Sequence, residues 1–104
     1  MFGKKEKSTD LEFFTVFDSK SSTYSEPFPA VNKDVVIRDF ATAFKHPEAA
    51  LKNRYFQNAE DFALFRVGTF CVREGKITAE NPTHCLNLHD LRAAVQSESG
   101  PRAL

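Results

Sequence analysis

Apolar and polar residues near the N-terminus follow a pattern typical of a β-hairpin. The segment Leu11–Phe17 is rich in Phe, Val and Thr, and its side chains would divide between the two faces of a strand. The polar residues 18–22 predict a turn, and Thr23–Phe28 can return as a second strand. Because Pro27 and Pro29 lack a backbone N–H, this second strand should lie at an edge of the sheet or end early.

The clearest helix signal begins at Asn32. This residue type favours a helix N-cap, and Asp34 suits the positive end of the helix dipole. Apolar residues then recur at three- and four-residue spacing, which predicts one apolar stripe along a helix. The stripe consists of Val36, Ile37, Phe40, Ala41 and Phe44. The helix should end at His46-Pro47, because a residue that precedes proline avoids the α conformation.

A second hairpin is predicted in the C-terminal half. Phe62–Val72 has the composition of a long strand, and simple alternation would separate Phe65 from Phe70 onto opposite faces. Gly68 inside this segment predicts a bulge or a bend. After a turn, Lys76–Thr78 can pair back as a short fourth strand.

The last periodic segment, Leu86–Val95, predicts a C-terminal helix with Asn87 as a possible cap. The element order is therefore β-β-α-β-β with a final helix, which indicates an α+β fold. We expect a small antiparallel sheet of two hairpins with one main helix packed on a face. Residues 11–95 would form this single domain, between a flexible basic tail at 1–10 and a flexible tail at 96–104.

Composition narrows the choice of function. The 104 residues carry no formal net charge, yet they include eleven phenylalanines. The apolar runs are too short to span a membrane, and no apolar stretch of a secretory signal follows the basic N-terminus. Two cysteines are too few for a disulfide framework, so a reducing compartment is expected.

Catalytic and metal-binding patterns are weak. Cys85 lies near His84 and His89, but nothing in the sequence supplies an orienting group or a Gly-rich elbow, so we expect no enzyme. The interval from Cys85 to His89 has ligand-like spacing, but the paired cysteines of a structural zinc site are missing. The scattered glycines form no phosphate-binding motif. No metal and no cofactor is therefore predicted.

The best functional signal is the presence of aromatic and basic residues on the same strands. Single-stranded nucleic-acid binders stack bases on aromatic rings and follow the phosphates with Lys or Arg. The rings of the first hairpin could combine with rings and arginines of the second. These residues are Phe13, Phe17, Tyr24, Phe65, Arg66, Phe70 and Arg73. Two observations oppose this hypothesis: phenylalanines on strands usually form the core, and residues 11–80 hold nine basic and ten acidic residues.

Two sequence blocks resemble the non-structural protein of gokushovirus-type microviruses, which are small single-stranded DNA phages; this protein is also called ORF5 or VP5. The first block is the segment from Phe13 to Phe44, and the second is EDFALFRVGTF, which ends at Phe70. The matching positions of the first block are Asp18, Lys20, Tyr24, Pro27, Phe28, Asn32, Ile37, Arg38, Asp39 and Phe40. Those of the second are Asp61, Phe62, Leu64, Phe65, Gly68 and Phe70.

The resemblance implies a role in phage genome replication without catalytic residues. That family is described as DNA-binding, or as favouring the switch from duplex replication to single-strand synthesis for packaging. The resemblance thus implies single-stranded DNA as the partner and the cytoplasm of a bacterial host as the location. The candidate nucleic-acid-binding residues are Lys20, Tyr24, Arg38, Phe65, Arg66, Phe70, Arg73 and Lys76.

A second hypothesis stays open from the sequence. The protein could be an adaptor that binds a phage replication or capsid protein, or a host replication factor, and its neutral charge favours this reading. Either function is compatible with a homodimer formed through an edge strand, because a small sheet leaves unpaired edges. DNA binding through phosphates predicts an affinity that falls steeply with salt.

Overall fold

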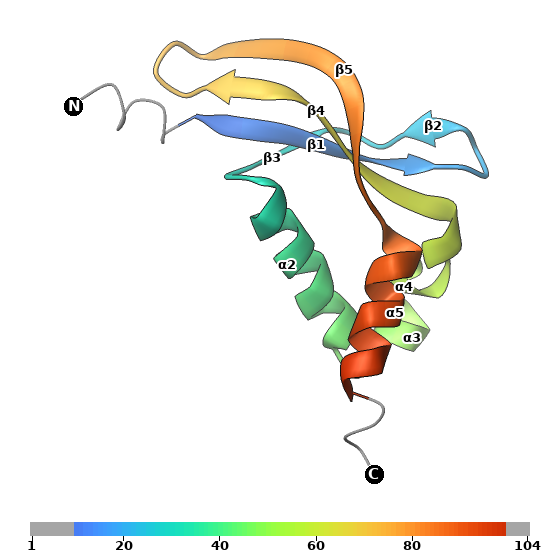
Figure 1. The fold of residues 1–104 in the computed structure, drawn as a ribbon. Helices are drawn as coiled ribbons and strands as arrows, with labels where there is room; N and C mark the ends of the chain where they lie inside the picture. The colour runs from blue at the N-terminus through green and yellow to red at the C-terminus, as the bar shows by residue number, and fades with distance from the viewer. Residues whose placement is uncertain (1–9, 100–104) are drawn as a thin grey trace.

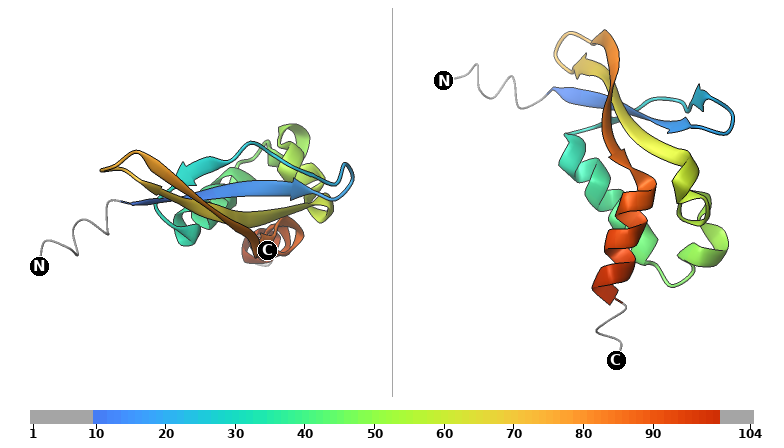
Figure 2. Two further views of the ribbon diagram at one scale, coloured as in Figure 1. Left: turned by 90° about the horizontal axis from the view of Figure 1, so that it is seen from above. Right: turned by 45° about the vertical axis from the view of Figure 1, so that its right-hand side comes forward.

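The computed structural model describes residues 10–99 and shows a sheet on one side and helices on the other (Figure 1). Two further views confirm that the helices gather on the same side of the sheet, while the far end of the β4–β5 hairpin extends past them (Figure 2). The α+β fold predicted from the sequence is confirmed. Most of the two predicted tails, residues 1–9 and 100–104, lies outside the described residues.

The sheet is antiparallel and has β1 and β4 at its centre. Strand β1 (Leu11–Asp18) pairs with β4 (Phe62–Cys71), and β4 pairs with β5 (Lys76–Asn87). The other side of β1 pairs with two short strands, β2 (Thr23–Tyr24) and β3 (Phe28–Ala30). The predicted second strand is thus present as an interrupted edge, consistent with the missing N–H donors of its prolines.

A bulge in β4 changes which side chains share a face. Phe13 pairs with Gly68, whereas Phe14 pairs with Arg66, so Val67 is an extra residue in β4. The extra residue reverses the alternation beyond it. Phe65 and Phe70 consequently lie on the same face of the sheet, and the simple alternation expected from the sequence was wrong here.

The bulge brings the backbone of residue 68 close to β5, and glycine permits this approach because it has no Cβ atom. A Cβ atom at this position would collide with the carbonyl oxygen of Thr78 and would lie 3.3 Å from the Cα atom of Ala79. Both obstacles are backbone, so they cannot rotate away as a side chain could. The site therefore requires glycine.

The helical layer begins as the sequence predicted. In α2 (Lys33–Lys45), the side chain of Asn32 accepts a hydrogen bond of 2.9 Å from the backbone N–H of Val35. The helix ends before His46-Pro47. Three short elements follow in the connection to the sheet: α3 (Ala49–Lys52), α4 (Arg54–Gln57) and the 3-10 turn η1 (Ala59–Asp61).

The C-terminal part differs from the prediction in its boundaries. Strand β5 continues to Asn87, far beyond the short strand expected at Lys76–Thr78. The final helix is present as α5, but it runs from Leu88 to Ser99, so the predicted domain boundary at residue 95 falls inside it. Hydrogen bonding to the long β4 extends β5, an effect that the polar sequence of residues 78–84 does not reveal.

The core lies between the sheet and the helices. It combines the residues of β1 and β4 that face the helices with the apolar sides of α2 and α5. Its buried members are Phe14, Val16, Val36, Phe44, Ala59, Phe62, Leu64, Leu88, Leu91 and Val95. No helix among residues 10–99 is long and apolar enough to cross a membrane.

Arg92 joins α5 to the connection between α4 and β4. Its guanidinium group donates hydrogen bonds to the backbone carbonyl of Phe56 at 2.8 Å and to the carboxylate of Glu60 at 2.7 Å. The bond from Arg92 is the main reason that the pKa of Glu60 lies below its ordinary value of 4.5. This ion pair connects α5 to the 3-10 turn η1.

We predict that Gly68→Ala lowers the free energy of unfolding by about 3 kcal/mol, because the new methyl group must displace backbone atoms. Gly75→Ala is the matched control: Gly75 has φ of +69°, but nothing lies within 4 Å of a Cβ there. It should cost about 1 kcal/mol, through backbone strain alone. Urea unfolding measures both values, and equal losses would contradict the proposed close contact.

We also predict that Glu60 contributes to acid sensitivity. Because its pKa is lowered in the folded state, its stabilising effect is present above about pH 4.5 and is lost as the pH falls through the lower folded value. Glu60→Gln should therefore be less stable than the wild type at pH 7, with the difference shrinking in acid. Thermal unfolding from pH 7 to pH 3 measures this, and in an Arg92→Met background the difference should be small at every pH.

Candidate nucleic-acid interface

The face of the sheet opposite the helices, here called the open face, carries a group of aromatic side chains. At the end of the sheet near β2, Phe17 contacts Tyr24 with ring centroids 4.8 Å apart, and Tyr24 lies 5.5 Å from Phe65. The ring of His84 on β5 lies 5.4 Å from Phe65. These four residues, one from each of β1, β2, β4 and β5, are called the proximal ring cluster.

A second aromatic group lies on the open face toward the β4–β5 turn. Phe13 and Phe70 contact each other edge to face, with centroids 6.1 Å apart, and are called the distal ring pair. Ile77, which is 66% exposed, is the cross-strand neighbour of Phe70 on β5. The bulge at Val67 produces this group, because it turns Phe70 to the same side as Phe65.

The rings of the open face do not belong to the core. None of the six side chains of the two groups is part of the buried cluster or among the side chains packed against it. Tyr24 is 47% exposed, and the four phenylalanines are partly exposed. The expectation that most strand phenylalanines fill the core therefore holds for Phe14 and Phe62 but not for this face.

A hydrogen-bonded bridge holds the interrupted edge strand beneath the rings. Thr15, which is 2% exposed, donates a hydrogen bond of 2.7 Å to the carbonyl of Ser25. The hydroxyl of Ser25 accepts a bond of 3.0 Å from the backbone N–H of Val16. Ser25 lies in the gap between β2 and β3, so its side chain replaces part of the missing ladder and keeps Tyr24 beside Phe17.

Positive charge near the open face is sparse. Lys20 is exposed in the turn between β1 and β2, beside the proximal ring cluster, and forms no ion pair with the residues that the structure describes. Arg73 and Lys76 are exposed at the other end of the sheet, where the ammonium group of Lys76 lies 3.8 Å from Glu74. The basic Lys4, Lys5 and Lys7 lie outside the described residues.

Two of the candidate basic residues lie away from the rings. Arg66 pairs with Phe14, so it points to the helical side, where it binds Glu12 at 3.1 Å and also Glu80. These carboxylates, Glu80 above all, raise the pKa of its guanidinium group and neutralise it locally. Arg38 is exposed on α2 in the helical layer. The structure thus brings Tyr24, Phe65 and Phe70 onto one face with Lys20 at one end, whereas Lys76 pairs with Cys71 and points to the opposite side of the sheet.

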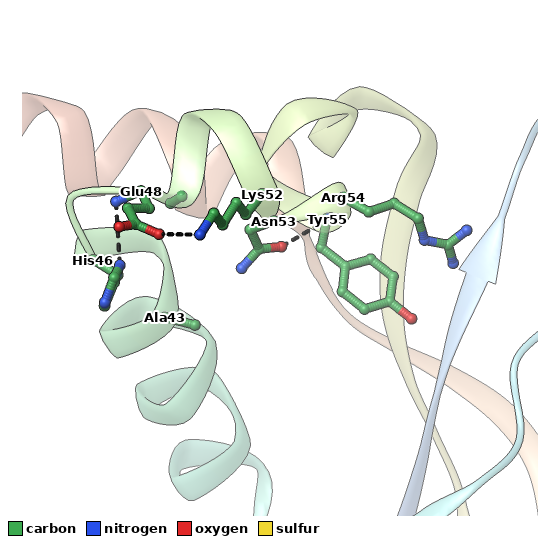
Figure 3. Close-up of a pocket in the computed structure, with 8 residues that line it drawn as sticks. Ala43, His46, Glu48, Lys52, Asn53, Arg54 and Tyr55 are labelled. Atoms are coloured by element: carbon green, nitrogen blue, oxygen red, sulfur yellow. Dashed lines mark hydrogen bonds and ion pairs between the residues drawn. The ribbon is translucent and has the colours of Figure 1, made fainter.

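A pocket of about 500 Å³ lies in the helical layer, between the end of α2 and the α3–α4 segment (Figure 3). Several of its polar groups already have partners within the fold. Lys52 pairs with Glu48 at 2.7 Å, and the side-chain oxygen of Asn53 caps α4 by accepting from the backbone N–H groups of Tyr55 and Phe56. These contacts order the α2–β4 connection.

The structure places Cys85 and its two neighbouring histidines in different surroundings. His84 lies on the open face, whereas Cys85 packs against the core, where burial raises the pKa of its thiol. His89 is on α5 near Arg92. None of these three residues lines the pocket, and residues 10–99 contain no group of three or more His, Cys, Asp or Glu side chains arranged to hold a metal ion.

Sequence reasoning missed two members of the open face. Ile77 was assigned only to a short strand, and His84 was considered only as a catalytic or metal-binding group. The register of β4 against β5 places them beside Phe70 and Phe65. That register includes two irregularities, so it could not be obtained by counting residues from the turn.

We predict that Ser25→Ala lowers the free energy of unfolding by about 1–2 kcal/mol, because the backbone N–H of Val16 loses its partner. The matched control is Ser21→Ala in the β1–β2 turn, where the hydroxyl bonds to the exposed side chain of Thr23. The control should change stability by less than about 0.5 kcal/mol. Urea unfolding compares the two, and a neutral Ser25→Ala would mean that the edge strand does not need the bridge.

Comparison with known proteins supports the resemblance found in the sequence. The family described as phage ORF5 protein matches residues 11–91, which include every strand and the first turn of α5. Comparisons with curated proteins and with solved structures gave no match. The match covers most of the chain and all of the open face. The chain therefore belongs to the phage ORF5 protein family.

Proposed function

We propose that this phage protein binds single-stranded DNA on its open face and acts in genome replication. The observation that carries the proposal is the helix-free side of the sheet with its two groups of partly exposed rings. Aromatic side chains on an open sheet face stack with unpaired bases, and four-stranded sheets in other folds hold two or three bases in this way. The mode of binding needs no catalytic group, and we propose none.

Single strands fit this face better than a duplex. The faces of paired bases are already stacked inside a duplex, whereas an unpaired base can turn a face toward Phe17, Tyr24 or Phe65. A duplex would have to be held by its phosphates, and the open face offers few cations for that purpose. Stacking, rather than phosphate contact, would supply most of the affinity.

The sparse charge makes the expected salt dependence modest. One phosphate contact, from Lys20, would give a slope of log K against log salt of about −0.7 for a single strand. Each further contact from the basic N-terminal residues would add about −0.7. The steep dependence expected from the sequence is therefore replaced by a shallow one.

The proposed role in replication follows from sequestering a strand. A protein that covers displaced single strands in the host cytoplasm makes them less available as templates for the complementary strand. This would favour single-strand synthesis and packaging over duplex replication. A homodimer would raise the local concentration of binding faces. Within the described residues, β5 is paired on one side only, and we propose that a second copy pairs with its other edge.

The test is fluorescence anisotropy with a labelled single-stranded oligonucleotide and its duplex, at low and at physiological salt. The wild type should prefer the single strand, and Tyr24→Ala should weaken binding by roughly 5- to 150-fold, the loss of one stacked base. Leu51→Ala is the matched control, because Leu51 is 78% exposed on α3 in the helical layer. Its affinity should equal that of the wild type.

Two results would contradict the proposal. One is an absence of single-strand binding at low salt, where attraction to phosphates is strongest. The other is an equal loss of affinity for Tyr24→Ala and Leu51→Ala. Either result would favour the adaptor function, which the zero net charge and the exposed rings also suit. The open face would then contact a phage or host replication protein, or a capsid protein.

A further inference from the structure

We infer that the open face holds one DNA strand at two separate stacking positions, aligned with β1, and that it reads no base sequence between them. This inference rests on the proposed function and specifies how the strand lies. The proximal ring cluster would be one position and the distal ring pair the other.

The spacing of the two positions follows from β1. Phe13 and Phe17 are on the same face of this strand and are four residues apart, which corresponds to about 13 Å. A stacked strand advances about 3.4 Å per nucleotide, so 13 Å equals roughly four steps. A stretched strand covers the same distance with fewer nucleotides. A segment of about five nucleotides is therefore long enough to occupy both positions.

The surface between the positions offers little for base recognition. Thr15 lies between Phe13 and Phe17 on β1, but it is 2% exposed and its hydroxyl group donates to Ser25. In the proximal cluster, the Nε2 atom of His84 already bonds with Asn87 at 2.8 Å. Because specific readout requires polar groups aimed at base edges, binding here should depend on ring faces and tolerate any sequence.

The position of Lys20 agrees with a strand that runs along β1. Lys20 follows the end of β1 at the proximal cluster, whereas Lys76, one residue before Ile77 on β5, pairs with Cys71 and points to the other side of the sheet. Lys20 can neutralise a phosphate where the strand enters or leaves the face. A strand that crossed the sheet perpendicular to β1 would reach only one of the two ring groups.

The test combines oligonucleotide length with variants of each position. Oligothymidylates of two to twelve nucleotides are titrated against the wild type, Tyr24→Ala, Phe70→Ala and the double variant, with Leu51→Ala as control. Wild-type affinity should rise with length up to about five nucleotides and then level off, apart from the statistical gain of longer strands. An oligonucleotide of eight nucleotides should lose roughly 5- to 150-fold in affinity with each single variant.

The shortest oligonucleotide distinguishes two positions from one. A dinucleotide can occupy only one position at a time, so either single variant should cost it no more than about twofold if the two positions are similar. The double variant should then lose binding to the dinucleotide almost completely. If a single variant costs the dinucleotide as much as it costs the eight-nucleotide strand, only one position exists and the inference is wrong, although the proposed function stands.

The outcome for the proposed function is separate. If the wild type binds neither the twelve-nucleotide strand nor any shorter one at low salt, the proposed function fails and the inference fails with it.

Because Phe70 is partly buried, thermal unfolding must show that each variant is folded. If Phe70→Ala does not fold, Phe70→Leu keeps the packing volume and removes the aromatic face, and it should give the same dependence on length.

A mixed-sequence strand of eight nucleotides should bind within a fewfold of oligothymidylate, and a preference beyond tenfold would overturn the absence of base readout.

Discussion

The arrangement of the open face depends on the close approach of the Gly68 backbone to β5. The space that a Cβ atom would need is occupied by the carbonyl of Thr78, so β4 can bulge at Val67 only because residue 68 is glycine. The bulge reverses the alternation of β4 and turns Phe70 toward Phe13 on the side without helices. Without the bulge, Phe70 would lie on the helical side, and the open face would carry the proximal ring cluster but not the distal ring pair.

The rest of the sheet adapts to this constraint. The edge strand beside β1 is interrupted by prolines, and the Thr15–Ser25 bridge supplies the hydrogen bonds that the ladder lacks there. On the other side, the irregular register of β5 brings Glu80 to Arg66, which pairs this cation with a carboxylate. These contacts pair polar groups of the sheet with one another. The open face is left apolar and weakly charged. This favours stacking over phosphate attraction as the source of the proposed DNA binding.

The helical layer packs against the side of the sheet that lies opposite the open face. Its apolar stripe covers one face of the sheet, and Arg92 ties α5 to the α4–β4 connection through Phe56 and Glu60. The pocket beside α3 is shaped by contacts that end one helix and begin the next. The helices thus cover one side of the sheet and leave the open face on the other.

The sequence by itself determined the elements whose signals are local. The cap at Asn32, the apolar stripe of α2, its end before Pro47 and the Phe-rich strands all follow from neighbouring residues, and the strand motifs carried the resemblance to phage ORF5 proteins. Only the tertiary structure decided the length of β5, the face of Phe70 and the pairing of Arg66 with two carboxylates. These depend on register between strands distant in the chain, which a one-residue bulge is enough to change.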